Sequence, residues 1–427
     1  MLNTTGLSLD QAPPITVPFA FFLAAPFFAM LVGLLLVWQG EAVLASRWSP
    51  AALAATHLLA LGFLTQIMCG ALFQMLPVLA GAPVPGVVPV GRLTQLCLVP
   101  GSLALSWGLY AGGRVWLMAG GTALAVGVAV FASAVGIALA RARGVPRTLM
   151  AMRLALVALV MTLLLGLMLL TALLGAQIPR FSAWVDLHLA WGLLGWAGLL
   201  IMGVGYQVVP MFHVTPGYPA WATRAGAPLV IAGLLGATLA TGMGRVDAAA
   251  WLSLFAAVGL AVFAMVTLSL QRRRERPRID VTLLYWWTAM LAILASAAAW
   301  LLGGRGELVG VLMLLGVGVA LPTGMLLKIM PFLSWFHLQH RQVGARRFAV
   351  RLPHMQVFIP ERAARVQLGV FLAALLCASL AAGLPGHPLA GWLGRTAGAA
   401  LLVSSALLWW LQLGCYRRYR RIRCQLG

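Results

Sequence analysis

Three stretches of this sequence share one pattern: GFLTQIMCGALFQMLP at 62–77, GWAGLLIMGVGYQVVP at 195–210 and GVGVALPTGMLLKIMP at 316–331. Each has glycine at its first and ninth positions, proline at its last, and a glutamine or lysine three residues before the proline. Glycine and proline are frequent in membrane helices, so a single copy would carry little information. Three copies in the same register indicate an internal repeat, in which the glycines allow close approach between helices.

The composition around these stretches is that of a membrane protein. Apolar residues make up 62% of the 427 residues, charged residues only 9%, and the mean hydropathy is +0.97. Soluble domains carry about 25% charged residues, and a membrane-spanning helix takes about 20 residues. The sequence therefore predicts an all-α polytopic membrane protein of about 12 transmembrane helices, forming one domain over 1–427. The expected spans are 16–38, 52–79, 93–111, 115–140, 154–177, 186–211, 227–243, 250–270, 281–303, 307–335, 366–384 and 395–413. With the motif in spans 2, 6 and 10, they form three pseudo-repeated four-helix units, at about 15–140, 154–270 and 281–413.

The distribution of basic residues predicts the topology. Of 29 Lys and Arg, 22 fall in the loops after even-numbered spans or in the C-terminal tail, and 6 fall in the loops after odd-numbered spans. This bias predicts a multi-pass protein of the bacterial cytoplasmic (inner) membrane with both termini in the cytoplasm. The net charge of +21 sits in short clusters between apolar runs, which favours the lipid bilayer rather than nucleic acid as partner. The five cysteines show no paired spacing.

Two histidines stand near the expected outer ends of motif spans. His57 lies in Thr56–Phe63 (THLLALGF), which Gly70, Ala71 and Leu72 follow, and His188 lies at the start of span 6. A histidine inside an apolar span needs a hydrogen-bond partner, a metal or a haem. Imidazole is a haem ligand, and the neighbouring Trp184, Trp191, Trp196 and Phe63 would suit a porphyrin.

These features resemble the catalytic subunit of the haem–copper oxidase superfamily and the NnrS family of predicted twelve-span haem proteins tied to nitric oxide responses. In the oxidases a low-spin haem ligand near the outer end of span 2 matches His57, and a copper ligand near the outer end of span 6 could match His188. The matching outer positions of the two histidines in repeated helices make both of them candidate ligands of haem b, at one site or at two, with a structural role for one of them as the alternative. The resemblance implies a role in electron transfer or in nitric oxide or oxygen handling. A quinol or a redox protein would then be the electron donor. The chain departs from the pattern, because span 10 lacks a His-x-His pair and span 7 has no histidine. The full haem–copper ligand set is missing, so whether the protein is an oxidoreductase stays open.

A second group of histidines lies at the expected inner face. His213 follows the span 6 proline by three residues, and His337 and His340 share one side of a continued span 10. If spans 6 and 10 adjoin, these three side chains could hold copper or another transition metal. The alternative is an interfacial cluster near lipid phosphates.

Two other classes of function remain as alternatives. The first is a transporter or channel for a small solute or metal, with a pathway along Gln74, Gln207 and Lys328, the only lysine. The second is a non-catalytic subunit of a respiratory complex. All eight carboxylates, from Asp10 to Glu361, fall in loops or at span ends, which argues against a carboxylate relay in the membrane. Tyr285, Trp286 and Trp287, at the start of span 9, are expected to form an interfacial aromatic belt.

Overall fold

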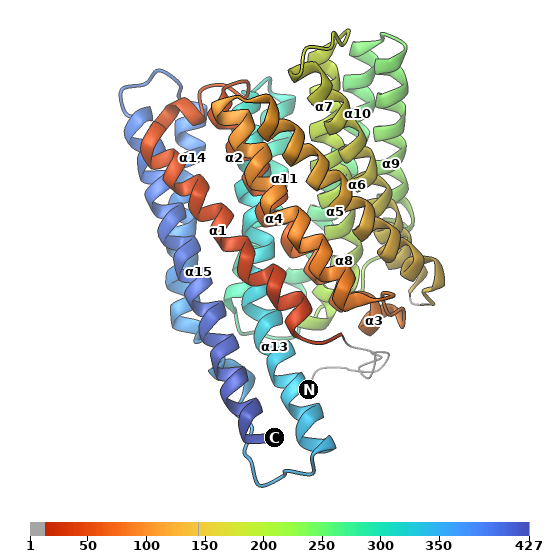
Figure 1. Cartoon of the computed structure of the whole chain (residues 1–427), viewed down its shortest axis with the longest axis vertical. Helices are drawn as coiled ribbons and strands as arrows, with labels where there is room; N and C mark the ends of the chain where they lie inside the picture. Colours follow the sequence, from red (N-terminus) through yellow and green to blue (C-terminus); the bar gives the residue numbers. More distant parts are fainter. Residues whose placement is uncertain (1–12, 144, 427) are drawn as a thin grey trace. The chain divides into compact units, whose positions relative to one another are not determined.

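The computed structural model describes residues 13–143 and 145–426, so Asp10 lies outside the described part of the chain. Helices make up nearly all of this part, and it contains no strand (Figure 1). Twelve helices are long and apolar enough to cross a membrane, and each overlaps one predicted span. The prediction of an all-α, multi-pass membrane protein is therefore confirmed. The longest extensions past predicted ends are those of the tenth and twelfth spans, to Gly344 and to Leu426, because these helices continue beyond the apolar residues.

Residue contacts divide the chain into two compact units, whose boundaries do not coincide with the three predicted repeats. The first unit comprises Ala71–Pro277 and Met290–Gly303, with Pro13. Its complete helices are α4 (Val87–Ala111), α5 (Arg114–Arg141), α6 (Pro146–Leu173), α7 (Phe181–Ala190), the π-helix η4 (Trp191–Gly198), α8 (Leu199–His213), α9 (Ala220–Gly242) and α10 (Val246–Arg272).

The second unit comprises Pro14–Gly70, Arg278–Ala289 and Gly304–Gly427. Its complete helices are α1 (Thr16–Gln39), η2 (Gly40–Val43), α2 (Pro50–His57), the π-helix η3 (Leu58–Thr65), α12 (Gly306–Val311), the π-helix η5 (Leu312–Val319), α13 (Ala320–Gly344), η6 (Met355–Val357), α14 (Glu361–Gly383) and α15 (Ala390–Leu426). Two helices, α3 (Gln66–Ala80) and α11 (Val281–Leu301), contribute residues to both units.

The three motif spans are the most buried of the twelve. In their most apolar windows 83%, 61% and 72% of the residues are buried, against 28–56% in the other nine spans. Each motif span also contains a π-helical segment of 8 residues: Leu58–Thr65, Trp191–Gly198 and Leu312–Val319. The first motif glycine, at 62, 195 or 316, is the fifth residue of its segment. Three identical departures from α-helix geometry support the register of the motif, while the grouping into three four-helix units stays a prediction.

The second motif glycine packs against the preceding span in all three copies. A Cβ built on Gly70 would lie 2.9 Å from the Cβ of Phe21 on α1. On Gly203 it would lie 3.0 Å from the Cβ of Ala151 on α6, and on Gly324 it would overlap Tyr285 on α11. Each partner is the fifth or sixth residue of its helix. The glycines therefore mark equivalent close helix crossings, as the sequence pattern predicted.

The start of α11 corrects the predicted aromatic belt. The side chains of Tyr285 and Trp286 are fully buried rather than interfacial. The Tyr285 hydroxyl donates to Oε1 of Gln367 at 2.6 Å, and the amide nitrogen of Gln367 donates to Oγ of Ser404 at 2.9 Å. These aromatic side chains belong to the core because Gly324 lets α11 approach α13 closely and Gln367, itself held by Ser404, satisfies the buried Tyr285 hydroxyl.

Candidate functional site

His57 is the last residue of α2, at the point where the α-helix passes into the π-helix η3. The helix begins with Ser49 as its N-cap, whose hydroxyl accepts a hydrogen bond from the amide of Ala52 at 3.1 Å. The imidazole is half-buried, and its Nδ1 lies 2.8 Å from the carbonyl oxygen of Leu53, one turn earlier in the same helix. Its surroundings in this unit are apolar, with Leu58, Leu59 and Phe63 buried nearby in the chain.

His188 lies on α7 and is held by a different helix. Its Nδ1 lies 3.1 Å from the carbonyl oxygen of Thr162 on α6. Its ring rests against Gly166, because a Cβ built on that glycine would lie 3.0 Å from Cε1 of the imidazole. Trp191, three residues later, is fully buried and donates from Nε1 to the hydroxyl of Thr238 at 2.9 Å. Helix α6 therefore both orients this imidazole and leaves room for it.

These two contacts determine the tautomer of both imidazoles. A backbone carbonyl can only accept a hydrogen bond, so in each ring Nδ1 must carry the proton. In the neutral imidazole Nε2 then carries the lone pair, which is the arrangement of most metal-bound histidines. The donor chemistry of His57 and His188 thus fits a haem iron. His57 belongs to the second unit and His188 to the first, and each is described in its own unit only.

The three histidines predicted as a metal site have unlike surroundings. His213 ends α8, is buried, and its Nδ1 lies 3.1 Å from the side-chain nitrogen of Gln271 on α10. His337 is half-buried on α13, whereas His340, one turn later, is exposed. Within residues 13–143 and 145–426, no group of three or more His, Cys, Asp or Glu side chains is placed to hold a metal ion. The predicted three-histidine site therefore has no support in the described chain.

The residue after His213 has an unusual backbone. Val214 adopts the left-handed conformation, with φ of 54° and ψ of 56°, which a β-branched residue rarely takes. Its carbonyl oxygen accepts a hydrogen bond from the amide of Glu275 at 2.9 Å. This contact and the His213–Gln271 hydrogen bond both join the end of α8 to the region where α10 ends. The strained residue thus holds His213 against α10.

Lys328 is ion-paired, which the sequence did not predict. Its Nζ lies 2.7 Å from Oδ2 of Asp280, and the two side chains are only 21% and 13% exposed. Oδ1 of Asp280 also accepts a hydrogen bond from the amide of Leu283, in the first turn of α11. The pair neutralises the lysine charge at the end of the span. The sequence did contain one indication of this pair, because Asp280 directly precedes the apolar run of span 9 on the side where most arginines lie.

Gln74 and Gln207 occupy the position of Lys328 in the other two motif copies, and both belong to the first unit. Oε1 of each is buried and accepts no hydrogen bond from the described residues. Buried amides without partners are uncommon in soluble cores, where most are satisfied. Their burial agrees with an interior position of the motif spans, but it does not identify a solute pathway.

Comparison with known proteins does not assign the chain to a family. No protein-family model matches the sequence, and no curated protein is significantly similar to it. The candidate site therefore rests on the geometry of the chain itself.

Proposed function

We propose that this membrane protein binds haem b, with Nε2 of His57 and Nε2 of His188 as iron ligands, each considered within its own unit, and that it acts in electron transfer or in nitric oxide or oxygen handling. One observation supports the proposal most directly. In both residues Nδ1 lies within hydrogen-bonding distance of a backbone carbonyl oxygen, at 2.8 Å in His57 and 3.1 Å in His188. This contact orients the ring and leaves the lone pair on Nε2.

Both rings lie in apolar, membrane-spanning helices and are half-buried. A neutral imidazole can coordinate iron without first losing a proton to solvent. Haem held in this way would supply a redox centre whose potential depends on its axial ligands and on the polarity around it. The chain's own contribution is to fix the orientation of each ring through its Nδ1 contact.

The proposal does not extend to haem–copper chemistry. The described residues offer no cluster of three potential metal ligands, so the proposed function includes no copper site. The transporter alternative on Gln74, Gln207 and Lys328 gains no support either, because the Lys328 charge is neutralised by Asp280. From the arginine distribution we also infer an inner-membrane location with cytoplasmic termini, which reporter fusions at loops of opposite predicted side would check.

An absorbance spectrum tests the proposal directly. The protein is produced with a haem precursor supplied in excess, purified, and measured oxidised and reduced. We expect a Soret band in the native protein, and a loss or shift of that band in His57→Ala and in His188→Ala. A matched control is His387→Ala, because His387 is an exposed residue of the loop before α15. Colourless native protein without iron would refute haem binding, and a spectrum unchanged in both variants would refute these ligands.

A further inference from the structure

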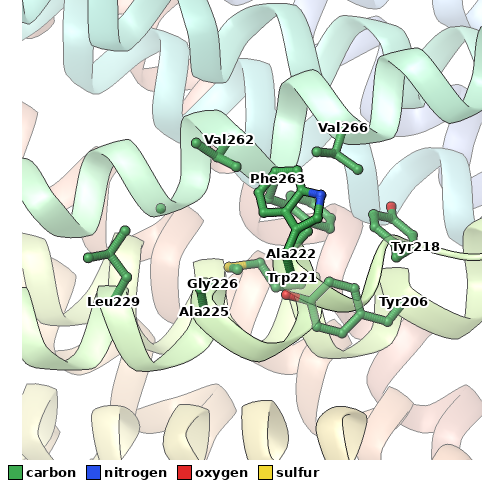
Figure 2. A pocket seen from close by; sticks show the side chains of 12 residues that line it. Tyr206, Tyr218, Trp221, Ala222, Ala225, Gly226, Leu229, Val262, Phe263 and Val266 are labelled. Carbon is green, nitrogen blue, oxygen red and sulfur yellow. The ribbon is translucent and has the colours of Figure 1, made fainter.

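A small cavity lies in the first unit between α8, α9 and α10 (Figure 2). Its volume is about 120 Å³, and its walls include Met202, Tyr206, Tyr218, Trp221, Val262 and Phe263. A dry cavity of about 150 Å³ in another protein admits benzene. This cavity is somewhat smaller, but part of its wall is exposed at Trp221, so a single six-membered ring is the largest ring system that it can take. It is too small for a porphyrin and is therefore not a haem site.

Aromatic rings form a rigid wall of the cavity. The rings of Tyr218 and Phe263 are stacked, with centroids 5.8 Å apart and an interplanar angle of 3°. The ring of Tyr206 meets both edge-on, at centroid distances of 5.1 Å and 6.0 Å. Figure 2 shows these side chains gathered beside Trp221 and Val266. Flat aromatic walls favour a planar ligand over a flexible chain, because a ring can stack on them over its whole face.

The two tyrosine hydroxyls of this wall differ in whether they already have a hydrogen-bond partner. The Tyr218 hydroxyl is hydrogen-bonded to Oγ1 of Thr267, at a distance of 2.8 Å. Burial in these apolar surroundings raises the pKa of Tyr218, so its hydroxyl stays protonated. The Tyr206 hydroxyl forms no hydrogen bond to a described residue, and it lies 3.0 Å from the point where a Cβ on Gly226 would stand. Because Gly226 has no side chain, no Cβ covers this hydroxyl on that side, while the methyl group of Met202, 2.7 Å from the same point, narrows the space beside it.

The cavity opens toward lipid near one end of the helices. Trp221, 58% exposed, is the second residue of α9, and Val262 and Val266 are half-exposed on α10. Val262 lies about 15 Å from the end of α10 at Arg272, at 1.5 Å per residue. Exposed side chains of membrane-spanning helices face hydrocarbon, so a ligand would enter from the bilayer rather than from water.

We propose that this cavity binds the ring of a prenylated quinone. The ring would stack against the aromatic wall, a ring carbonyl oxygen would accept a hydrogen bond from the Tyr206 hydroxyl, and the prenyl tail would remain in lipid. A lipid acyl chain fits less well, because it has no acceptor for this hydroxyl and gains little from flat walls. The proposal concerns binding alone and does not depend on haem.

Fluorescence quenching tests the proposal on the full-length protein in lipid nanodiscs. Decyl-benzoquinone is titrated in, and saturable tryptophan quenching is expected in the native protein, with Trp221→Phe identifying the contribution of Trp221. Tyr206→Phe keeps the ring but removes the hydroxyl, so it should weaken binding about 2- to 10-fold, the value of one hydrogen bond. Val266→Phe should fill the cavity and abolish binding. Val258→Phe, at a 42% exposed position on α10 outside the cavity, should not.

Three outcomes would overturn the quinone site. They are quenching that never saturates, unchanged binding in a folded Val266→Phe protein, and equal competition by decanol, which has the chain but no ring. A thermal unfolding curve for each variant confirms that the fold is intact. Haem content is read from the absorbance of the same samples, so quinone binding and haem binding can fail separately.

Discussion

Alanine at the second motif glycine should destabilise the three copies to different degrees. The strongest effect is expected for Gly324→Ala, because the new Cβ would overlap Tyr285, whose hydroxyl is fixed by Gln367. Gly70→Ala brings the Cβ to 2.9 Å from the side chains of both Phe21 and Phe22. Gly203→Ala brings the Cβ to 3.0 Å from the Ala151 Cβ and 3.3 Å from the Thr148 carbonyl oxygen, the mildest crowding of the three, which a small helix shift can relieve.

The magnitudes follow from two opposing contributions. Overpacking costs about 1–3 kcal/mol, whereas replacing glycine by alanine inside a helix gains up to about 1 kcal/mol. We therefore expect a loss of roughly 2 kcal/mol or more for Gly324→Ala, about 1 kcal/mol for Gly70→Ala, and close to zero for Gly203→Ala. The control is Gly369→Ala on α14, where no atom lies within 4 Å of the new Cβ and a small gain is expected.

Unfolding in detergent measures this series, with a thiol-reactive dye that reports exposure of the buried Cys69 and Cys415. The midpoint should fall most for Gly324→Ala and least for Gly203→Ala. The packing argument would be refuted if Gly203→Ala lost as much stability as Gly324→Ala. It would also be refuted if the open position Gly369 proved the most sensitive.

Two further predictions concern the ion pair and the second candidate ligand. Asp280→Asn leaves the Lys328 ammonium without its partner and should lower the free energy of unfolding by about 1–3 kcal/mol in the same assay. The double variant with Lys328→Gln should recover most of this loss. Equal stability of the single and the double variant would contradict the prediction. Gly166→Ala should displace the His188 ring, because the new Cβ would lie 3.0 Å from Cε1 of the imidazole, and the haem absorbance should shift as a result. The control is Gly136→Ala, whose nearest contact is at 3.7 Å and which should leave the spectrum unchanged.

The repeated glycine and proline motif predicted more of the fold than of the candidate functional site. The spacing of glycines 62 and 70 and their counterparts predicted close crossings, and the structure places a neighbouring helix at each second glycine. It could not predict the π-helical segments, since an i→i+5 bonding pattern leaves no clear trace in an apolar sequence. The sequence also could not show which nitrogen of His57 and His188 is engaged, which depends on the backbone carbonyl beside each ring. Haem binding by these residues stays a proposal.

Tyr285 and Lys328 illustrate what depends on distant contacts. The position of Tyr285 at a span end predicted an interfacial residue, yet Gln367, far along the chain, provides the partner that lets it be buried. The partner of Lys328 is Asp280, which the sequence placed among loop carboxylates without a contact. In both cases the decisive neighbour lies on another helix, and periodicity along one helix carries no information about it.

The sequence by itself determined that this chain crosses a membrane about twelve times as helices, because a chain with 9% charged residues cannot cover a surface in water. Its repeated glycines also predicted which spans make close helix crossings, and these spans are the most buried of the twelve. The tertiary structure decided the tautomers of His57 and His188, the pairing of Lys328, and the aromatic cavity beside Tyr206. Most of these features depend on atoms that come from separate helices. Which helices lie next to each other is determined by side-chain packing in the folded protein.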